Sequence, residues 1–428
     1  MNRIHRLVIL FLVTAVGSLL AQTGAPVPEL QMFDSRVAGL LDKWKVPGAA
    51  LAITNNGRLV FAHGYGLANL DTGEPVQPDS LFRIASVSKP FTATGIMKLV
   101  EEGKLDPDAK VYSILRDLMP PQGQLIDERL RDITVRDLLR HSGGWDDHAL
   151  DPLKYALLPV AAANYFGVPS PPSARMLIRY AYSNVPLDNT PGTKYAYSNF
   201  GYTLLGRVIE EISGIRYEEF IRREILNPAG IQRMAISGNS PGTALPGEVR
   251  YYDYPDAPLA PTIFAEGPNM LPAPYDMENR MMDAFGGWAA SAIDLVRFSE
   301  AFDGRRGTAL LKPETIQTMV VHDWNLWPGR DVWQGLGWVV QPAGGGFILS
   351  HNGEHRGDRS LLVHWPGGLS VAMVFNSCPL RSDDFITDVG STLAATLAQV
   401  RTWPANDLFS QYDSAPLSAL SRASGHIR

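Results

Sequence analysis

Apolar residues recur at three- and four-residue intervals between residues 29 and 44. They are Leu30, Phe33, Val37, Leu40, Leu41 and Trp44. This spacing places them on one face and predicts an amphipathic helix. Residues 48–54 and 58–65 are apolar, strand-like runs joined at Asn55-Asn56-Gly57, a sequence that favours a tight hairpin turn. This part of the chain is therefore expected to form a helix followed by a β-hairpin.

A second block of apolar periodicity lies near the C-terminus. Helical spacing is found over 292–302 and 313–320, and a closing amphipathic helix is predicted over 383–400. Between them, strand-like runs separated by glycine-rich turns occupy residues 335–340, 346–351, 360–365 and 370–376. Their short spacing predicts successive antiparallel strands.

The middle of the chain has a different pattern. Short helical stretches (134–140, 201–213 and 217–226) alternate with long loops rich in proline and glycine, the longest over about 238–285. The simplest arrangement is an α+β fold in which strands from both ends form one antiparallel sheet flanked by helices. We expect an inserted, mostly helical lobe over about 106–284, with a cleft between lobe and sheet.

Residues 1–21 have the features of a secretory signal peptide. Arg3 and Arg6 precede an apolar run from Leu7 to Leu20, and Ala21 follows it. Cleavage near Ala21–Gln22 would leave no membrane span and would export the protein to the periplasm or the medium; the alternative is an uncleaved anchor helix. We expect one domain over residues 22–404 and a loosely ordered tail over 405–428.

The amino-acid composition indicates which kinds of molecule the protein could bind. Of the 428 residues, 45% are hydrophobic and 19% are charged, which suits a globular chain with a large core. The formal net charge is −6 and no basic patch is present, which argues against nucleic acid as a partner. Cys378 is the only cysteine, so no intrachain disulfide can form. A small-molecule or peptide substrate is expected, and the oligomeric state is left open.

The first chemical motif is Ser86-Val87-Ser88-Lys89, the only Ser-x-x-Lys in the sequence. It lies where a helix running to about Glu102 is expected to begin. At a helix start, Ser86 would lie beside free backbone N–H groups, and Lys89 would follow one turn later on the same face. A desolvated lysine can take the proton of a serine and activate it as a nucleophile. The alternative is that Ser86 only begins a helix and that Lys89 is an ordinary surface lysine.

Two further motifs follow, each in two copies. Tyr197-Ser198-Asn199 lies between a Pro-Gly turn and a predicted helix, whereas Tyr182-Ser183-Asn184 leads into Val185-Pro186 and an expected loose loop. We prefer Tyr197, because the turn and the helix fix its position. His351-Asn352-Gly353 lies at the end of a strand-like run, and His141-Ser142-Gly143 is a competing match. Gly353 would let a substrate backbone approach the strand edge.

Taken in order, the Ser-x-x-Lys, Tyr-Ser-Asn and His-x-Gly motifs resemble those of the serine β-lactamase and penicillin-binding-protein superfamily. Within it, the sequence is most similar to class C β-lactamases and their relatives: esterases, D-aminopeptidases and D,D-carboxypeptidases. The resemblance covers roughly residues 30–400 and includes two supporting stretches, 138–144 and 286–291. It implies a β-lactamase/transpeptidase-like fold and an acyl-enzyme mechanism without a cofactor.

The resemblance also implies roles for individual residues. Ser86 would be the acylated nucleophile, and Lys89 would assist its deprotonation. Tyr197 would pass the proton to the leaving group and then activate water, while Asn199 would orient Lys89 and the substrate. The oxyanion hole would consist of the backbone N–H groups of Ser86 and Glu354.

His351 departs from the superfamily pattern, which usually has a lysine at this position. A histidine is mostly neutral at pH 7 and anchors a substrate carboxylate less well. Glu354 would add negative charge beside the site. Both features favour an uncharged ester or amide over a penicillin or a D-Ala-D-Ala terminus, although β-lactamase or D-Ala-D-Ala carboxypeptidase activity is the alternative function.

Two other classes of function need consideration. His351-Asn352-Gly353-Glu354-His355 matches the H-x-x-E-H pattern of metallopeptidases, which requires a helix. The flanking sequence predicts strands, in which the two histidines would lie roughly 13 Å apart, so we expect no metal. A non-catalytic binding or sensor module of the same fold is the third hypothesis; a binding module would have no use for the proton shuttle that Ser86, Lys89 and Tyr197 would form.

The segments 145–190 and 238–285 are expected to shape the pocket. Their tryptophan, tyrosine, phenylalanine and proline content predicts a partly apolar site.

Overall fold

The computed structural model describes residues 22–120, 124–147, 158–305, 307 and 309–413. Its main feature is an antiparallel sheet with the strand order β1-β3-β2-β14-β13-β12-β11-β10, and β4 pairs with β3 outside this path. The strands are β1 (Gln22–Thr23), β2 (Gly48–Asn55), β3 (Arg58–Asn69), β4 (Glu74–Pro75), β10 (Trp333–Gln334), β11 (Val339–Ala343), β12 (Gly346–His355), β13 (Asp358–Trp365) and β14 (Leu369–Phe375). The pairing of β2 with β14 joins the two ends of the chain, which confirms the predicted α+β architecture.

The hairpin between β2 and β3 forms at the predicted turn. Asn55 pairs with Arg58, and the two residues between them, Asn56 and Gly57, have φ angles of 52° and 77°. A two-residue hairpin turn requires positive φ at both positions, which asparagine and glycine tolerate best.

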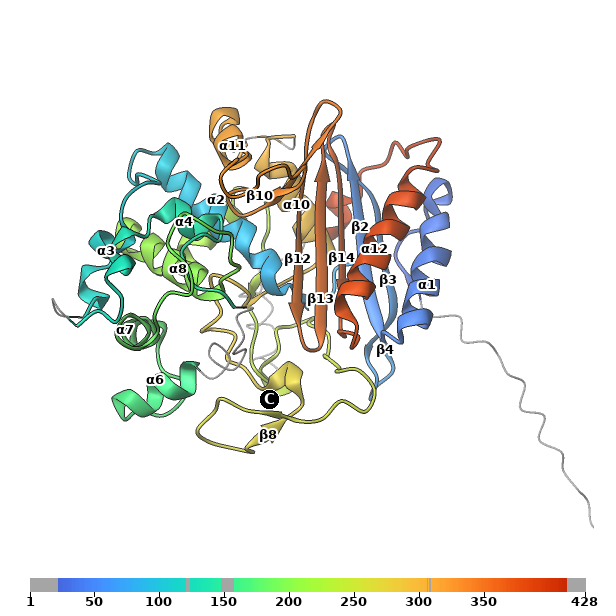
Figure 1. The fold of residues 1–428 in the computed structure, drawn as a ribbon. Helices are drawn as coiled ribbons and strands as arrows, with labels where there is room; N and C mark the ends of the chain where they lie inside the picture. The colour runs from blue at the N-terminus through green and yellow to red at the C-terminus, as the bar shows by residue number, and fades with distance from the viewer. Residues whose placement is uncertain (1–21, 121–123, 148–157, 306, 308, 414–428) are drawn as a thin grey trace, which may run out of the picture.

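Helices cover both faces of the sheet (Figure 1). Helices α1 (Met32–Trp44) and α12 (Ser382–Leu397) pack together over one face, where Leu51 and Ile53 of β2 belong to their hydrophobic core. Ala50 and Ala52 point to the opposite face, against α10 (Ala292–Phe302). Because successive side chains of a strand alternate between faces, β2 contributes to two separate cores.

The lobe beside the sheet consists mainly of short helices (Figure 1). Helix α2 (Ser88–Glu101) packs against α8 (Asn199–Ser213) and joins the lobe to the sheet domain. The other helices of the lobe are α3 (Val111–Ile114), α4 (Val135–Leu139), α6 (Leu158–Phe166), α7 (Ala174–Asn184) and α9 (Tyr217–Ile221), whereas α11 (Pro313–Met319) lies beside β10.

Helix α7 was not predicted from the sequence. Tyr182 lies in its last turn, before the loop that begins at Val185. It is fully buried, and its ring meets that of Trp145 at a centroid distance of 6.0 Å. Tyr182 is thus a packing residue of the lobe.

The long segment 238–285 contains little regular structure. A small sheet of β5 (Phe82–Arg83), β9 (Trp288–Ala290) and β6 (Ala235–Ile236) lies at its base, and β7 (Ala260–Pro261) pairs with β8 (Met270–Leu271). The segment ends at a short 3₁₀ turn, η7 (Ala273–Tyr275), followed by turns that lead into β9. This loop therefore runs back to the strand next to Ser86.

The segment after Pro404 packs against the rest of the protein, whereas the sequence predicted a loosely ordered tail. The backbone N–H of Leu408 donates to Leu59 O at 2.8 Å, and Phe409 is fully buried. The expectation of a loose tail is therefore wrong for residues 405–413, because Leu408 and Phe409 supply apolar surface for the core; residues 414–428 lie outside the described part.

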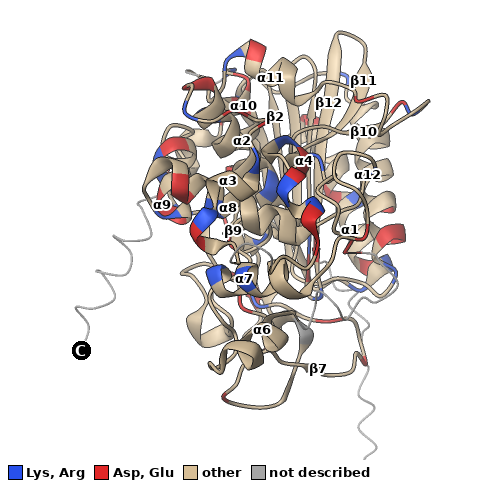
Figure 2. Ribbon diagram, turned by 60° about the vertical axis from the view of Figure 1, so that its left-hand side comes forward, with Lys and Arg blue, Asp and Glu red and all other residues tan. Residues whose placement is uncertain are grey.

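The expected signal peptide, residues 1–21, also lies outside the described residues. In the part of the chain that the structure describes, no helix has the length and apolar character to cross a membrane. Acidic and basic residues are interspersed over the helices (Figure 2).

Candidate active site

Ser86 lies in a 3₁₀ turn, η2 (Ala85–Val87), directly before α2. Strand β12 packs against this turn, and β13 adds a hydrogen bond from Ser360 Oγ to Ile84 O at 2.7 Å. A Cβ atom on Gly353 would overlap Ile84 O, so only glycine lets β12 lie this close. The sequence suggested that Gly353 makes room for a substrate; in the structure it makes room for the backbone that carries Ser86.

Two side chains donate hydrogen bonds to the Ser86 hydroxyl oxygen. Lys89 Nζ donates to Ser86 Oγ at 2.9 Å, and Tyr197 OH donates to the same oxygen at 2.8 Å. Lys89 Nζ also donates to Asn199 Oδ1 at 2.7 Å and to Phe285 O at 2.9 Å. Residues from α2, from the start of α8 and from the loop before β9 thus meet at one point; Ser86, Lys89, Tyr197 and Asn199 come from two of the three sequence motifs, Ser-x-x-Lys and Tyr-Ser-Asn.

The surroundings of Lys89 make it suitable as a base. The side chain is fully buried, and this burial lowers the pKa of its ammonium group to about 7, with the charge of Asp147 acting in the opposite direction. A neutral amine is therefore well populated at neutral pH, in contact with the serine hydroxyl.

Tyr197 is suited to the opposite role. Burial raises the pKa of its phenol well above the usual value, and the hydrogen bond to Ser86 offsets only part of this effect. The phenol therefore keeps its proton at neutral pH and can donate it to an oxygen or nitrogen that gains charge.

Two further residues position these groups: Asp147, which the sequence reasoning missed, and His141, which it considered only as a competing match for His351. Asp147 Oδ2 accepts the backbone N–H of Asn199 at 2.7 Å, and the Asp147 N–H donates to Tyr197 O at 2.9 Å. The ring of His141 stacks on that of Tyr197 at a centroid distance of 4.3 Å, and its Nδ1 accepts the Ser198 N–H at 3.1 Å. Burial and the nearby Lys89 charge lower the pKa of His141 well below its usual value, so this ring is neutral.

His351 is placed differently from the expectation. It is buried beside Lys89 and does not line the cavity formed by the described residues. Burial, followed by the positive charge of Lys89, lowers its pKa to about 3, and its Nδ1–H donates to Asn352 O at 2.7 Å. A neutral histidine agrees with the sequence analysis, but its expected place at the substrate is not supported, because the side chain is buried and does not reach the described cavity.

Glu354 also differs from the expectation. Its carboxylate accepts from Arg359 Nη1 at 2.8 Å and from Ser382 Oγ at 2.7 Å. The residue lines the cavity, but this pairing neutralises the negative charge that the sequence suggested. On a strand, Glu354 points to the face opposite that of its neighbours Gly353 and His355.

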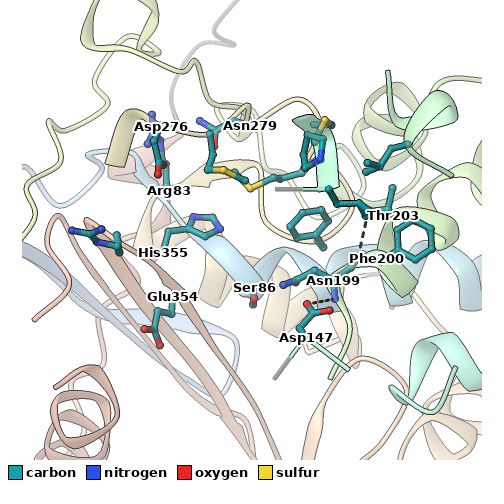
Figure 3. Close-up of a pocket in the computed structure, with 18 of the residues that line it drawn as sticks. Arg83, Ser86, Asp147, Asn199, Phe200, Thr203, Asp276, Asn279, Glu354 and His355 are labelled. Carbon is teal, nitrogen blue, oxygen red and sulfur yellow. Dashed lines mark hydrogen bonds between the residues drawn. The ribbon is translucent and has the colours of Figure 1, made fainter. Parts of the chain in front are cut away.

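A cavity of about 390 Å³ opens above Ser86 (Figure 3). Its lining comes largely from the two predicted segments and is mostly apolar, with polar groups on one side. The described lining residues are Arg83, Ser86, Asp147, Leu158, Pro159, Leu177, Asn199, Phe200, Thr203, Pro274, Asp276, Met277, Asn279, Met281, Met282, Phe285, Glu354, His355 and Arg356. A volume of this size suits a small molecule or the end of a peptide.

The alternative zinc motif lies on a strand. His351 and His355 both belong to β12, where residues four apart are separated by roughly 13 Å. Among the described residues, no three histidine, cysteine or acidic side chains are grouped as a metal site.

Comparisons with known proteins identify the family. A sequence model of the protein family described as "Beta-lactamase" matches residues 33–390 of this chain. The chain is 28% identical over 380 residues to "Penicillin-binding protein 4" of Amycolatopsis lactamdurans, covering 86% of this chain and 90% of that protein. It is 27% identical over 352 residues to a "D-aminopeptidase" of Brucella anthropi, covering 81% of this chain but only 59% of that protein.

Two solved structures superpose on this chain and have the same fold. The octameric penicillin-binding protein homologue from Pyrococcus abyssi superposes with a TM-score of 0.65 at 25% identity, covering 85% of this chain and 77% of that one. The D-amino acid amidase from Ochrobactrum anthropi has a TM-score of 0.63 at 22% identity, covering 87% of this chain and all of that one, which bears on the fold alone.

Proposed function

The chain belongs to the β-lactamase family, and from this premise we propose that it is a serine hydrolase that cleaves an ester or amide bond through an acyl-enzyme on Ser86. The observation that carries the proposal is the simultaneous contact of Ser86 Oγ with Lys89 Nζ and the Tyr197 hydroxyl. A poor nucleophile in contact with one base and one acid is the arrangement that acyl transfer requires. A binding or sensor module would not need this arrangement.

In the acylation step, neutral Lys89 takes the Ser86 proton while Oγ attacks the substrate carbonyl carbon. The carbonyl oxygen gains negative charge, which the backbone N–H groups of Ser86 and Glu354 would stabilise. When the bond to the leaving group breaks, Tyr197 gives its proton to that group and receives one from Lys89. The leaving group thus departs with the Tyr197 proton, the former serine proton replaces it on Tyr197, and the acyl group ends on Ser86.

Deacylation repeats these transfers with water as the nucleophile. A water molecule attacks the acyl carbon and loses its proton to the Tyr197–Lys89 pair, and Ser86 Oγ regains a proton as it leaves. Asn199 supports both steps by accepting a hydrogen bond from Lys89.

We further propose that the substrate lacks a free carboxylate near the scissile bond. His351, which would have to attract such a group, is buried and neutral, and Glu354 is paired with Arg359. An uncharged ester or amide needs no positive charge at this place to bind. The carboxylate of a penicillin or of a D-Ala-D-Ala terminus would meet no free positive charge there.

The experiment that tests this function is hydrolysis of a small substrate panel by the wild type and by Ser86→Ala. The panel holds p-nitrophenyl esters of several chain lengths, D-amino-acid p-nitroanilides, nitrocefin and a D-Ala-D-Ala peptide. Turnover of esters or anilides above nitrocefin, abolished in the variant, supports the proposal. Nitrocefin turnover above every ester would favour a β-lactamase, and no turnover of any substrate would favour a binding module.

Export is proposed on the sequence alone. The basic and apolar pattern of residues 1–21 suits a cleaved signal peptide. N-terminal sequencing of protein expressed with these residues tests it: a start at Gln22 in the exported fraction is expected, and a retained Met1 would argue against cleavage.

A further inference from the structure

The cavity above Ser86 has two chemically different sides (Figure 3). The apolar lining residues include Leu158, Leu177 and Phe200 from the lobe helices, and Met281 and Phe285 from the loop before β9. Arg83, Asp276, Asn279 and His355 lie together on the side away from Phe200, and Arg356 also lines the cavity. The charged groups of this second side determine which ionic ligand could bind next to the nucleophile.

Both arginines of the polar side are already held by the protein. Arg83 donates to Pro274 O and to Gly238 O, and its Nε lies 3.8 Å from Glu248 Oε1. Arg356 Nη2 donates to Asp253 Oδ2 at 2.6 Å. Because each guanidinium has its own carboxylate nearby, neither offers a free positive charge to a substrate anion.

Asp276 differs from the other acidic residues of the lining. Glu354 is paired with Arg359, and Asp147 accepts the Asn199 N–H. Asp276 is half-buried, and among the described residues it forms no ion pair. A carboxylate partly withdrawn from water gains more than an exposed one when a cation binds to it.

The ionisation of Asp276 is consistent with a role near neutral pH. Burial raises the pKa of this carboxyl to about 6, with Asp253 acting in the same direction and Arg356 and His355 acting against it. The group is therefore mostly charged at pH 7 and becomes neutral as the pH falls through 6. His355, which also lines the cavity, has Asp358 as its own carboxylate neighbour, with Nδ1 at 3.4 Å from Asp358 Oδ2.

We propose that Asp276 binds a protonated amine on the acyl side of the substrate, so that the preferred substrates are aminoacyl esters or amides. This inference rests on the proposed function and adds the substrate class. Because Asp276 and Ser86 line the same cavity, one small ligand can place its ammonium group at the first and its carbonyl group at the second. The apolar side would then hold the aliphatic or aromatic part of the substrate.

The test compares pairs of p-nitroanilides in which only the ammonium group is exchanged for a methyl group. Glycyl is paired with propanoyl, β-alanyl with butanoyl, and 4-aminobutyryl with pentanoyl, so that the amine is placed at increasing distances from the carbonyl. The alanyl and isobutanoyl anilides, with both enantiomers of the former, add a branched pair. For at least one pair we expect kcat/KM at pH 7 to be at least about tenfold higher for the amine, as expected for a charge-assisted contact.

Asp276→Asn should lower kcat/KM for that amine about tenfold more than for its methyl counterpart. Glu278→Gln is the matched control, because Glu278 belongs to the same segment but does not line the cavity and bonds to Asn239. It should leave the amine preference unchanged. In the wild type the preference should fall as the pH decreases from 7.5 to 5, whereas Asp276→Asn should show no such fall.

The outcomes separate this inference from the proposed function. Hydrolysis of the methyl compounds with no preference for any amine, or a preference that survives Asp276→Asn, would overturn the amine subsite and leave the serine hydrolase intact. Absence of turnover for every pair, together with the absence of any acyl-enzyme, would overturn both.

Discussion

Replacing Tyr197 by phenylalanine removes a single oxygen atom from the group around Ser86. The lost hydroxyl donates to Ser86 Oγ at 2.8 Å, whereas the contact with Lys89 at 2.9 Å remains, so the site should keep its shape. Loss of a general acid lowers the rate by about 10²–10⁴-fold. We expect kcat/KM for a p-nitroanilide to fall at least about 100-fold, which corresponds to about 2.7 kcal/mol in the barrier.

The chain offers a matched control in Tyr182→Phe, the same change in the second Tyr-Ser-Asn copy. Its hydroxyl is buried and has no hydrogen-bond partner among the described residues, so its removal should leave kcat/KM near the wild-type value.

The assay should also include a p-nitrophenyl ester of the same acyl group, whose leaving group departs without a proton. In kcat/KM, which reports acylation, the Tyr197→Phe loss should be larger for the anilide than for the ester. Equal losses for both substrates, or a larger loss in Tyr182→Phe, would refute the role of Tyr197 as the acid.

Three further predictions follow from the electrostatics of the site. Since the active form contains neutral Lys89, whose pKa burial lowers to about 7, kcat/KM for a neutral ester should rise with pH through about 7; a fall over this range would contradict the assignment. Dialysis against EDTA should leave the activity intact, and a loss restored by zinc would revive the pair His351 and His355. His351→Lys should leave the ratio of nitrocefin to ester turnover near the wild-type value, because this position is buried beside Lys89 and does not line the described cavity; a rise of about tenfold in the ratio would show that it does control substrate charge.

The sheet and its hairpins were predictable because their signals are local. The turn at Asn56-Gly57 needs positive φ at both residues, and the apolar runs of β2, β3, β13 and β14 are long enough to identify strands. Helix α7 was missed although Leu177, Ile178, Ala181 and Tyr182 have helical spacing. The Val185-Pro186 pair that follows favours a loop, because a residue directly before a proline rarely adopts the helical conformation.

The parts of the site that were not predictable depend on contacts between distant segments. Glu354 is neutralised by Arg359 because β12 and β13 pair in a register that places these two residues opposite each other. His351 is buried by the meeting of β12 with the lobe, and Asp147 reaches Asn199 across a loop with no motif of its own. Spacing along the chain carries no information on such contacts, whereas Ser86 and Lys89 lie one helical turn apart and could be recognised as a pair.

The most direct measurement of the central claim is the intact mass of the protein after reaction with a fluorophosphonate, followed by peptide mapping. The account predicts one adduct per chain, located on the peptide that contains Ser86, and none on Ser86→Ala. Ser240→Ala, a change at an exposed serine that does not line the cavity, should be labelled as fully as the wild type. An adduct on another serine, or an unlabelled wild type that still hydrolyses esters, would contradict the assignment of Ser86 as the nucleophile.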